Sequence, residues 1–204
     1  MDLRIDVLED IKQDILKNMK CPLKDNATNL VFGKGNPYAD IMFIGEAPGK
    51  NEDLQGLPFV GKAGEQLNRL LNVIDLNIDD VYIANILKFR PPNNRNPEND
   101  EIVRHTPYLI RQIGVIKPKI IATLGNYATK FVLSGFCVEK MNKVLGISQI
   151  HGKVFLVHFN DISFKVVPIY HPAAMLYNPN IKESFENDFM MMKKIIESSS
   201  KDNS

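Results

Sequence analysis

Asp40-Ile-Met-Phe-Ile-Gly-Glu-Ala-Pro-Gly-Lys-Asn-Glu-Asp53 is the stretch that decides the fold. Its apolar run, Ile41 to Ile44, is bounded by turn signals and is typical of a buried strand. The run breaks into Gly45-Glu-Ala-Pro-Gly49, which places one carboxylate, Glu46, just beyond the strand. Two glycines and a proline fix an unusual backbone and let another group approach closely. Because open parallel sheets bind ligands at this end of their strands, Glu46 is either a site residue or a solvated residue of a tight turn.

Strands and helices alternate along the rest of the chain. Further strands are predicted at 80–88, 119–124 and 164–170, with a short hairpin near 153–158. Periodic apolar residues predict helices at 2–17, 63–74, 97–115, 126–133 and 180–197, followed by a frayed tail over 198–204. This alternation is typical of a parallel sheet with helices on both faces. We therefore predict one α/β domain over residues 1–204, a three-layer α/β/α fold with a central, mostly parallel sheet of four strands.

The helix at 97–115 has an explicit start signal. Asn96 is a suitable N-cap, Pro97 suits the first helical position, and acidic residues fill the first turn. Pro107 lies inside this helix and predicts a bend.

Two polar residues stand out at the ends of other strands. Asn85 interrupts an apolar run, and a buried asparagine must be hydrogen-bonded, either to a neighbouring loop or to a ligand. His171 directly follows the strand at 164–170. Glu46, Asn85 and His171 thus lie near the carboxyl ends of three strands, which converge on one crevice in this fold class.

Composition limits the other possibilities. The chain has 204 residues, 44% of them hydrophobic and 24% charged, as in an ordinary soluble domain. No apolar run approaches a membrane span of about 20 residues, and no signal peptide is evident. Cys21 and Cys137 stand far apart, so we expect free thiols and a cytoplasmic or other reducing compartment. A net charge of +1 means that any nucleic acid would be bound by a local patch.

Taken together, the motifs resemble the uracil-DNA glycosylase superfamily, specifically family 4, the thermostable or iron–sulfur type. The resemblance covers about residues 18–196. Each motif alone is weak, but their order is specific. They are Gly45-Glu-Ala-Pro-Gly49 with Glu52-Asp53, Gly56-Leu-Pro-Phe-Val-Gly61, Val81-Tyr-Ile-Ala-Asn85, Arg90-Pro-Pro with Arg95-Asn-Pro97, Leu124-Gly125, and His171-Pro-Ala-Ala174.

The resemblance implies hydrolysis of the bond between uracil N1 and deoxyribose C1′, after the base is flipped out of the DNA. Phe59 would stack on uracil, and Asn85 would pair with its O4 and N3 edge. Glu52 would crowd the C5 edge against the thymine methyl group. His171 would donate toward O2, where negative charge develops.

Glu46 would orient the attacking water or stabilise the cationic sugar, with Gly45 and Ala47 forming the rest of the substrate-binding motif. Ala47 stands where family 1 enzymes carry an aspartate, so the division of roles between Glu46 and His171 stays open.

The resemblance also implies DNA contacts around the crevice. Met175, Leu176 and Tyr177 follow the His171 motif and could enter the gap left by the flipped base, although ordinary packing at a helix start is the alternative. Basic residues on nearby loops could hold phosphates or could simply be solvated. They are Lys50, Lys62, Lys88, Arg90 and Arg95.

The chain departs from family 4 at the iron–sulfur cluster. The four cysteine positions of that family correspond to Asn18, Cys21, Phe89 and His105, so one thiolate remains. A cluster needs about four thiolates, or histidines in place of some, so we predict no cofactor and no metal site. Phe89 would fill the space with apolar volume. The loop from Phe89 to Pro97 also lacks the histidine with which some relatives trap DNA covalently.

The sequence therefore predicts a monofunctional, metal-independent uracil-DNA glycosylase that starts base-excision repair. Removal of another deaminated base is one alternative, and a catalytically silent DNA-binding or partner-recruiting module is another. The expected partner is uracil-containing DNA, bound by a monomer without a membrane. Contacts with other repair or replication proteins stay open.

Overall fold

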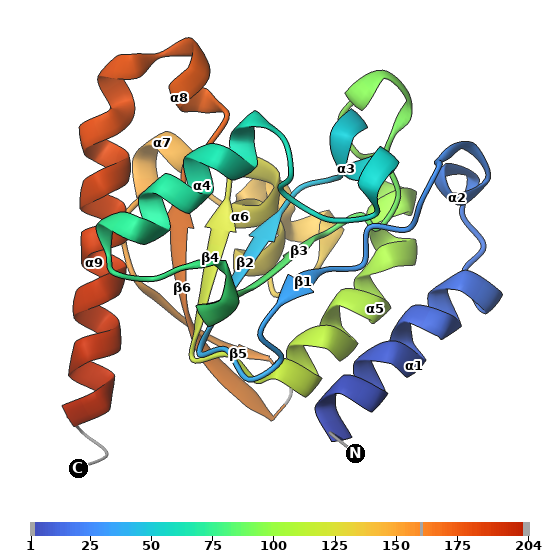
Figure 1. Ribbon diagram of the computed structural model, residues 1–204, viewed down its shortest axis with the longest axis horizontal. Helices are drawn as coiled ribbons and strands as arrows, with labels where there is room; N and C mark the ends of the chain where they lie inside the picture. The colour runs from blue at the N-terminus through green and yellow to red at the C-terminus, as the bar shows by residue number, and fades with distance from the viewer. Residues whose placement is uncertain (1–2, 160, 202–204) are drawn as a thin grey trace.

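A six-stranded sheet is the centre of the computed structural model, which describes residues 3–159 and 161–201 (Figure 1). The strand order is β1-β3-β2-β4-β6-β5. The strands are β1 Lys34–Gly35, β2 Ile41–Gly45, β3 Tyr82–Asn85, β4 Ile120–Leu124, β5 Phe155–Phe159 and β6 Ile162–Ile169. The four inner strands are parallel to one another, whereas β1 and β5 pair antiparallel at the two edges.

The predicted α/β class and the mostly parallel sheet are confirmed, but the sheet has six strands rather than four. The two additional strands are edge strands that flank the parallel core. β1 has only two residues, too few for a periodic signal, and β5 is the first arm of the hairpin expected near 153–158. β3 is also shorter than predicted, because Ile78–Asp80 forms a short 3-10 turn, η1, capped by Asn77.

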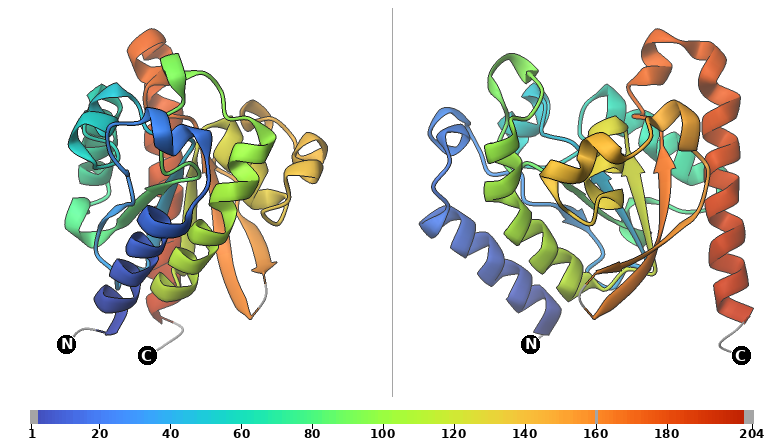
Figure 2. Two further views of the ribbon diagram at one scale, coloured as in Figure 1. Left: turned by 90° about the vertical axis from the view of Figure 1, so that its right-hand side faces the viewer. Right: turned by 180° about the vertical axis from the view of Figure 1, so that it is seen from behind.

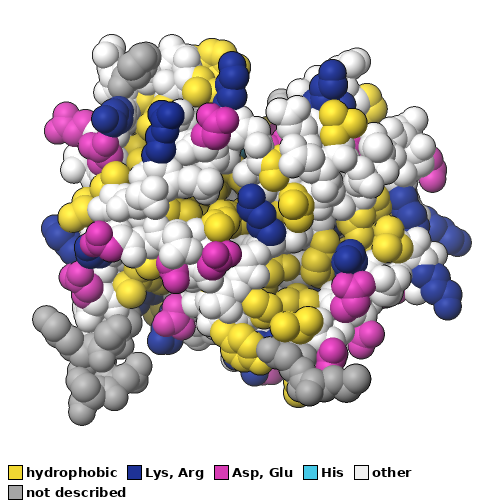
Figure 3. Space-filling view, viewed as in Figure 1, with side chains coloured by type: hydrophobic (Ala, Val, Ile, Leu, Met, Phe, Trp, Pro, Cys, Tyr) yellow, Lys and Arg dark blue, Asp and Glu magenta, His cyan; other side chains and the backbone are white. Residues whose placement is uncertain are grey.

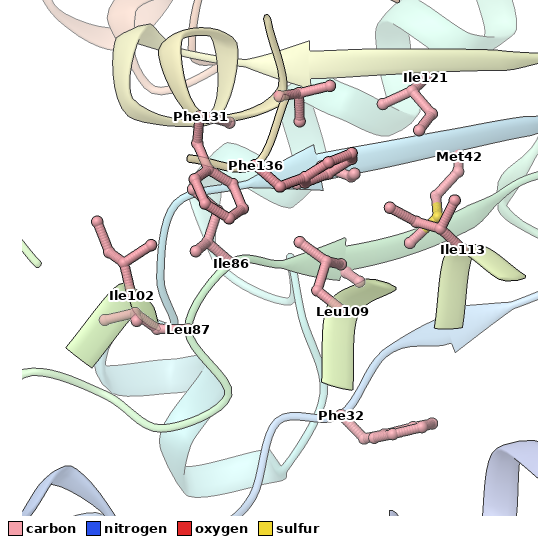
Figure 4. Close-up of a cluster of buried hydrophobic side chains, with 14 of the residues drawn as sticks. Phe32, Met42, Ile86, Leu87, Ile102, Leu109, Ile113, Ile121, Phe131 and Phe136 are labelled. Atoms are coloured by element: carbon pink, nitrogen blue, oxygen red, sulfur yellow. The ribbon is translucent and has the colours of Figure 1, made fainter. Parts of the chain in front are cut away.

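Side chains of β2 alternate between two hydrophobic clusters, one on each face of the sheet. Met42 and Ile44 join the cluster beneath α1 (Leu3–Asn18), α5 (Asn99–Ile116) and α6 (Asn126–Leu133). Ile41 and Phe43 join the cluster beneath α4 (Lys62–Val73) and α9 (Lys182–Lys201). Figures 1 and 2 show these helices as separate layers on either side of the sheet, and Figure 4 shows Leu109 and Ile113 of α5 beside Met42 and Ile86. The three-layer prediction is therefore confirmed.

Short elements fill the connections between these layers. They are α2 Pro22–Asn26, α3 Lys50–Gln55, η2 Pro92–Asn94, η3 Val138–Lys143, α7 Ile147–Ile150, α8 Ala174–Tyr177 and η4 Pro179–Ile181. α3 is too short to show a periodic signal in the sequence, because six residues make less than two turns.

Two predicted helix boundaries were wrong. α5 begins at Asn99 with Glu98 as its cap, because the Glu98 backbone N–H donates to Glu101 in a capping box (2.8 Å), and Arg95 holds the same carboxylate (2.9 Å). Asn96 and Pro97 thus precede the helix. α9 continues to Lys201, so the predicted tail is helical over 198–201, and its remainder, like Met1 and Asp2, lies outside the described residues.

Both cysteines are free, as predicted. Within the described ranges, no helix combines the length and hydropathy needed to cross a membrane.

Candidate active site at the carboxyl ends of the strands

A cavity of about 410 Å³ opens where β2 and β3 end. Six of the residues that line it were predicted from the sequence as site residues, and they come from five different segments of the chain. They are Glu46, Ala47, Glu52, Phe59, Asn85 and His171. The structure thus brings together residues up to 125 positions apart (46 to 171), as expected for the carboxyl edge of a parallel sheet.

Gly45 allows two of these side chains to meet at the floor of the cavity. It is the register partner of Asn85 in the parallel pair of β2 and β3. A Cβ atom at Gly45 would lie 2.3 Å from Asn85 Oδ1 and 2.9 Å from the Phe59 ring. Both distances are shorter than any real contact, so only glycine permits this packing.

Asn85 is 2% exposed, and its Oδ1 atom has no hydrogen-bond partner within the described part of the chain. A buried amide oxygen without a partner is destabilising unless something else supplies the donor. Of the two interpretations of Asn85, this geometry favours a ligand over a tie to a neighbouring loop.

The Phe59 ring lies beside the His171 ring, with centroids 5.8 Å apart and planes tilted by 31°. The Phe59 backbone is left-handed, at φ 51°, which is uncommon for a bulky side chain. Lys34 of β1 stabilises it, because Lys34 Nζ donates to the Phe59 carbonyl at 3.1 Å. Lys34 was not among the site residues predicted from the sequence, although its place between two glycines was a visible signal.

Glu52, which lies in α3, holds the loop that carries Phe59. Its Oε1 atom accepts hydrogen bonds from the backbone N–H groups of Val60 and Gly61, both at 3.0 Å. The carboxylate lines the cavity while fixing the two residues after Phe59. Its position therefore serves loop geometry in addition to any contact with a bound molecule.

His171 is neutral in this environment. Burial lowers its pKa below the ordinary value of 6.5, and only the Glu52 carboxylate opposes that shift. The Ala173 backbone N–H donates to His171 Nδ1 at 3.3 Å. A neutral ring that accepts at Nδ1 carries its proton on Nε2, so we assign that tautomer. His171 is then a hydrogen-bond donor at the cavity.

Glu46 has a raised pKa, because burial disfavours its charged form. No ion pair involves Glu46 in the described ranges. Its backbone carbonyl accepts a hydrogen bond from the Leu87 N–H at 3.0 Å, which fixes the start of the Gly45–Gly49 turn against the segment after β3. A half-buried carboxylate without a cation partner is typical of functional sites.

The predicted DNA-contacting residues other than Arg95 lie outside the cavity lining. Leu176 and Tyr177 are 40% and 87% exposed on α8, and Met175 is partly buried against the cluster under α4 and α9. Lys62 is exposed at the start of α4, and Arg90 is half-buried and donates to Asn94 Oδ1 at 2.8 Å.

Lys88 is the clear correction among the basic residues, because it is 0% exposed and cannot reach a phosphate. Arg95 lines the cavity rim but is held by Glu101. The face seen in Figure 3 mixes basic and acidic side chains, consistent with the net charge of +1.

The residues at the four cluster positions do not fit an iron–sulfur cluster. The Asn18 amide is exposed and donates to Asp14 Oδ1 at 2.7 Å. Phe89 is 3% exposed, with its ring edge-on to His105 at a centroid distance of 6.1 Å. Burial raises the pKa of the Cys21 thiol and lowers that of His105 to about 4.

Among the described residues, none is a hydrogen-bond partner of the buried His105 Nε2, although Nδ1 contacts the Glu101 carbonyl at 2.7 Å. One buried thiol and one buried imidazole are too few donors for four iron sites. Over residues 3–159 and 161–201, no group of three or more His, Cys, Asp or Glu side chains could hold a metal ion.

Comparisons with known proteins give the family. A model of the uracil DNA glycosylase superfamily matches residues 32–194. The type-4 uracil-DNA glycosylase of Sulfurisphaera tokodaii is 46% identical over 94% of this chain and 86% of its own length. The enzymes of the same name from Archaeoglobus fulgidus and Thermotoga maritima are 46% and 39% identical, over 89% and 87% of this chain and 89% and 88% of their own lengths.

Proposed function

The chain belongs to the uracil DNA glycosylase superfamily, and on that premise we propose that it hydrolyses the N-glycosidic bond of uracil in DNA. The observation that carries the proposal is the convergence of an aromatic ring, a buried amide with a free oxygen, a neutral imidazole and a carboxylate on one cavity. Removal of uracil leaves an abasic site, so the reaction starts base-excision repair.

Base recognition is assigned to Phe59 and Asn85. The cavity lies at the end of two strands and cannot be reached by a base inside a duplex, so the nucleotide is flipped out before reaction. Phe59 stacks on the ring, while the Asn85 amide accepts from N3–H and donates to O4. Cytosine presents the reversed pattern at this edge, which would leave the buried amide unpaired, so it is rejected.

His171 and Glu46 carry the chemistry. As the bond from N1 to C1′ lengthens, negative charge grows on the uracil and positive charge on the sugar. The Nε2–H of neutral His171 donates toward uracil O2, where the negative charge gathers. The Glu46 carboxylate stabilises the cationic sugar or orients the water that attacks C1′.

Met175, Leu176 and Tyr177 are assigned to the gap that the flipped nucleotide leaves in the DNA. Support for this role comes from the high exposure of Leu176 and Tyr177, since large apolar side chains on a short helix are otherwise unfavourable in water. Lys62 and Arg90 are assigned to phosphate contacts.

We further propose that the protein acts without an iron–sulfur cluster. Support comes from the poor donor set, because Phe89 supplies no ligand and the Asn18 amide is directed to Asp14. The cluster positions lie at the end of α1, just before α2, after β3 and on α5, and none of the four residues lines the cavity. Activity therefore does not require a group bound there.

The test is one incubation with two readouts. Purified protein is mixed with a labelled oligonucleotide containing one uracil in the presence of EDTA, and alkali then cleaves abasic sites; iron is assayed on the same sample. We expect cleavage at uracil and substoichiometric iron. Folded protein that cuts no uracil would overturn the activity, and stoichiometric iron would overturn the cluster-free proposal alone.

A further inference from the structure

Lys88 is a completely buried lysine directly behind the candidate base-recognition residue. Its side chain is 0% exposed. Its Nζ atom donates to the Asn85 backbone carbonyl at 2.8 Å and to Gln112 Oε1 at 2.6 Å, and it lies 3.5 Å from the Phe32 carbonyl. All three acceptors are neutral, and no ion pair involves Lys88 in the described part of the chain.

Such a burial is unfavourable by itself. A buried amine without a carboxylate partner loses its hydration and receives only hydrogen bonds to neutral acceptors. Burial accordingly lowers the pKa of Lys88 to about 7. An apolar side chain of similar length would fill the same space with less desolvation. The position of the amine therefore has to be explained by what its hydrogen bonds hold.

The three acceptors come from three separate segments. Phe32 precedes β1, Asn85 ends β3, and Gln112 lies in α5, where its Nε2 also donates to Phe32 O at 3.1 Å and to Tyr82 Oη at 3.2 Å. Lys88 thus joins the end of β3 to the helix layer below it. One of these bonds reaches the peptide group of Asn85, the residue whose side chain lies in the cavity floor.

The side-chain amide of Asn85 packs closely against the backbone of Gly45. The amide oxygen lies over Gly45, where even a methyl group would overlap it. A shift of the Asn85 carbonyl would therefore move the amide within a cavity that Phe59 also lines.

We propose that Lys88 is a positioning residue that fixes the Asn85 backbone, and through it the orientation of the base-reading amide. This inference rests on the proposed function, because it deepens the role given to Asn85. Lys88 touches neither the substrate nor the reacting atoms, and it acts through the Asn85 carbonyl.

The primary test is Lys88→Met, which keeps the length and removes the donor. Loss of a hydrogen bond from a charged group predicts a fall of about tenfold or more in kcat/KM on a uracil oligonucleotide. Inhibition by free uracil should weaken in parallel, because it reports the pocket without the chemistry. The matched control is Thr129→Val, which breaks the buried 2.9 Å bond between the Thr123 and Thr129 hydroxyls away from Asn85 and should leave both values within about twofold.

A second variant, Gln112→Leu, separates positioning from stability. It removes the donor of the Phe32 carbonyl and of the Tyr82 hydroxyl, so it should lower the melting temperature. It leaves the bond from Lys88 Nζ to the Asn85 carbonyl in place, so kcat/KM and uracil inhibition should stay within about twofold of the parent values.

The outcomes distinguish the two proposals. Cleavage by the parent protein tests the proposed function first, and only ratios between variant and parent test Lys88. Folded Lys88→Met with parental kcat/KM and uracil inhibition overturns the inference. A loss of activity in Gln112→Leu as large as that in Lys88→Met also overturns it, because general destabilisation would then account for both, and Gln112→Leu carries the test if Lys88→Met does not fold.

Discussion

At the scale of single residues, burial of Glu46 makes the folded state less stable whenever the carboxyl group is ionised. Burial raises the pKa of Glu46 above its ordinary value of 4.5. Between these two values the folded state holds a proton that the unfolded state has released, so rising pH through that window favours unfolding. We predict that Glu46→Gln raises the melting temperature at pH 7 and that the gain disappears below about pH 4, where both states are protonated.

The same substitution should remove activity. In the proposed mechanism the ionised carboxylate is the working form, so kcat/KM of the parent should fall as pH drops through the raised pKa of Glu46. Thermal melts and single-turnover cleavage across pH 4 to 8, on parent and variant, check both parts. A Glu46→Gln variant that cleaves uracil at the parental rate contradicts the assigned role.

Gly45 gives a prediction with an internal control. Gly45→Ala must displace Asn85 Oδ1 or the Phe59 ring, from 2.3 and 2.9 Å, so we expect a loss of about 100-fold or more in cleavage. Gly114→Ala in α5 meets no atom within 4 Å and should stabilise the protein by about 0.5–1 kcal/mol with full activity. Equal activity of the two variants would show that the cavity floor is not the site.

The fate of individual polar residues shows what sequence can and cannot predict. Asn85 was recognised because an amide inside an apolar run is anomalous in any fold. Lys88, three positions later, was misassigned to phosphate binding, because nothing in a linear pattern shows that α5 places Gln112 within hydrogen-bond distance of the Lys88 amine. The clustering of site residues followed from strand polarity, whereas the hydrogen bonds that hold them depend on packing between distant segments.

At the scale of elements, long segments were predictable and short ones were not. The parallel strands and the helices α1, α4, α5, α6 and α9 have enough residues for their periodicity to be counted. α3 and β1 have six and two residues, and their existence depends on tertiary contacts. These two elements carry Glu52 and Lys34, which hold the Phe59 loop. Glu52 was selected from its motif, but its hydrogen bonds to the Phe59 loop were not predicted, and Lys34 was not selected at all.

Phe89 gives the prediction at this scale. It lies in the segment after β3, is 3% exposed, and packs edge-on against His105 of α5. Phe89→Ala should lower the free energy of unfolding by about 3–5 kcal/mol, because it leaves a cavity. Cleavage per folded molecule should be retained, since Phe89 does not line the active cavity.

Urea denaturation and single-turnover cleavage at low temperature measure the two effects separately. Phe89→Leu, which keeps most of the volume, should recover much of the stability and is the matched control. If Phe89→Ala were as stable as the parent, the buried Phe89 ring would not be a structural element of this protein.

At the scale of the whole molecule, the charge distribution limits how the protein can hold DNA. The chain has 25 basic and 24 acidic side chains, and several of the basic ones are already engaged, such as Arg95 with Glu101, Arg111 with Asp14 and Lys119 with Asp40. We therefore expect DNA affinity to rest on a few local cations and on the apolar residues of α8 rather than on a general positive field.

This arrangement predicts a shallow dependence of DNA affinity on salt. Each neutralised phosphate adds about −0.9 to the slope of log K against log salt on duplex DNA, so two or three contacts predict a slope of about −2 to −3. Lys62→Ala and Arg90→Ala should each reduce its magnitude by about one, whereas Tyr177→Ala should weaken binding at every salt concentration and leave the slope unchanged, because an aromatic wedge releases no counterions. Fluorescence anisotropy with abasic duplex at several salt concentrations measures all four slopes, with Lys12→Ala on α1 as the control that changes none. A parental slope steeper than about −6 would mean that many more cations face the DNA than this surface offers, and the assignment of the contact to the crevice rim would then be wrong.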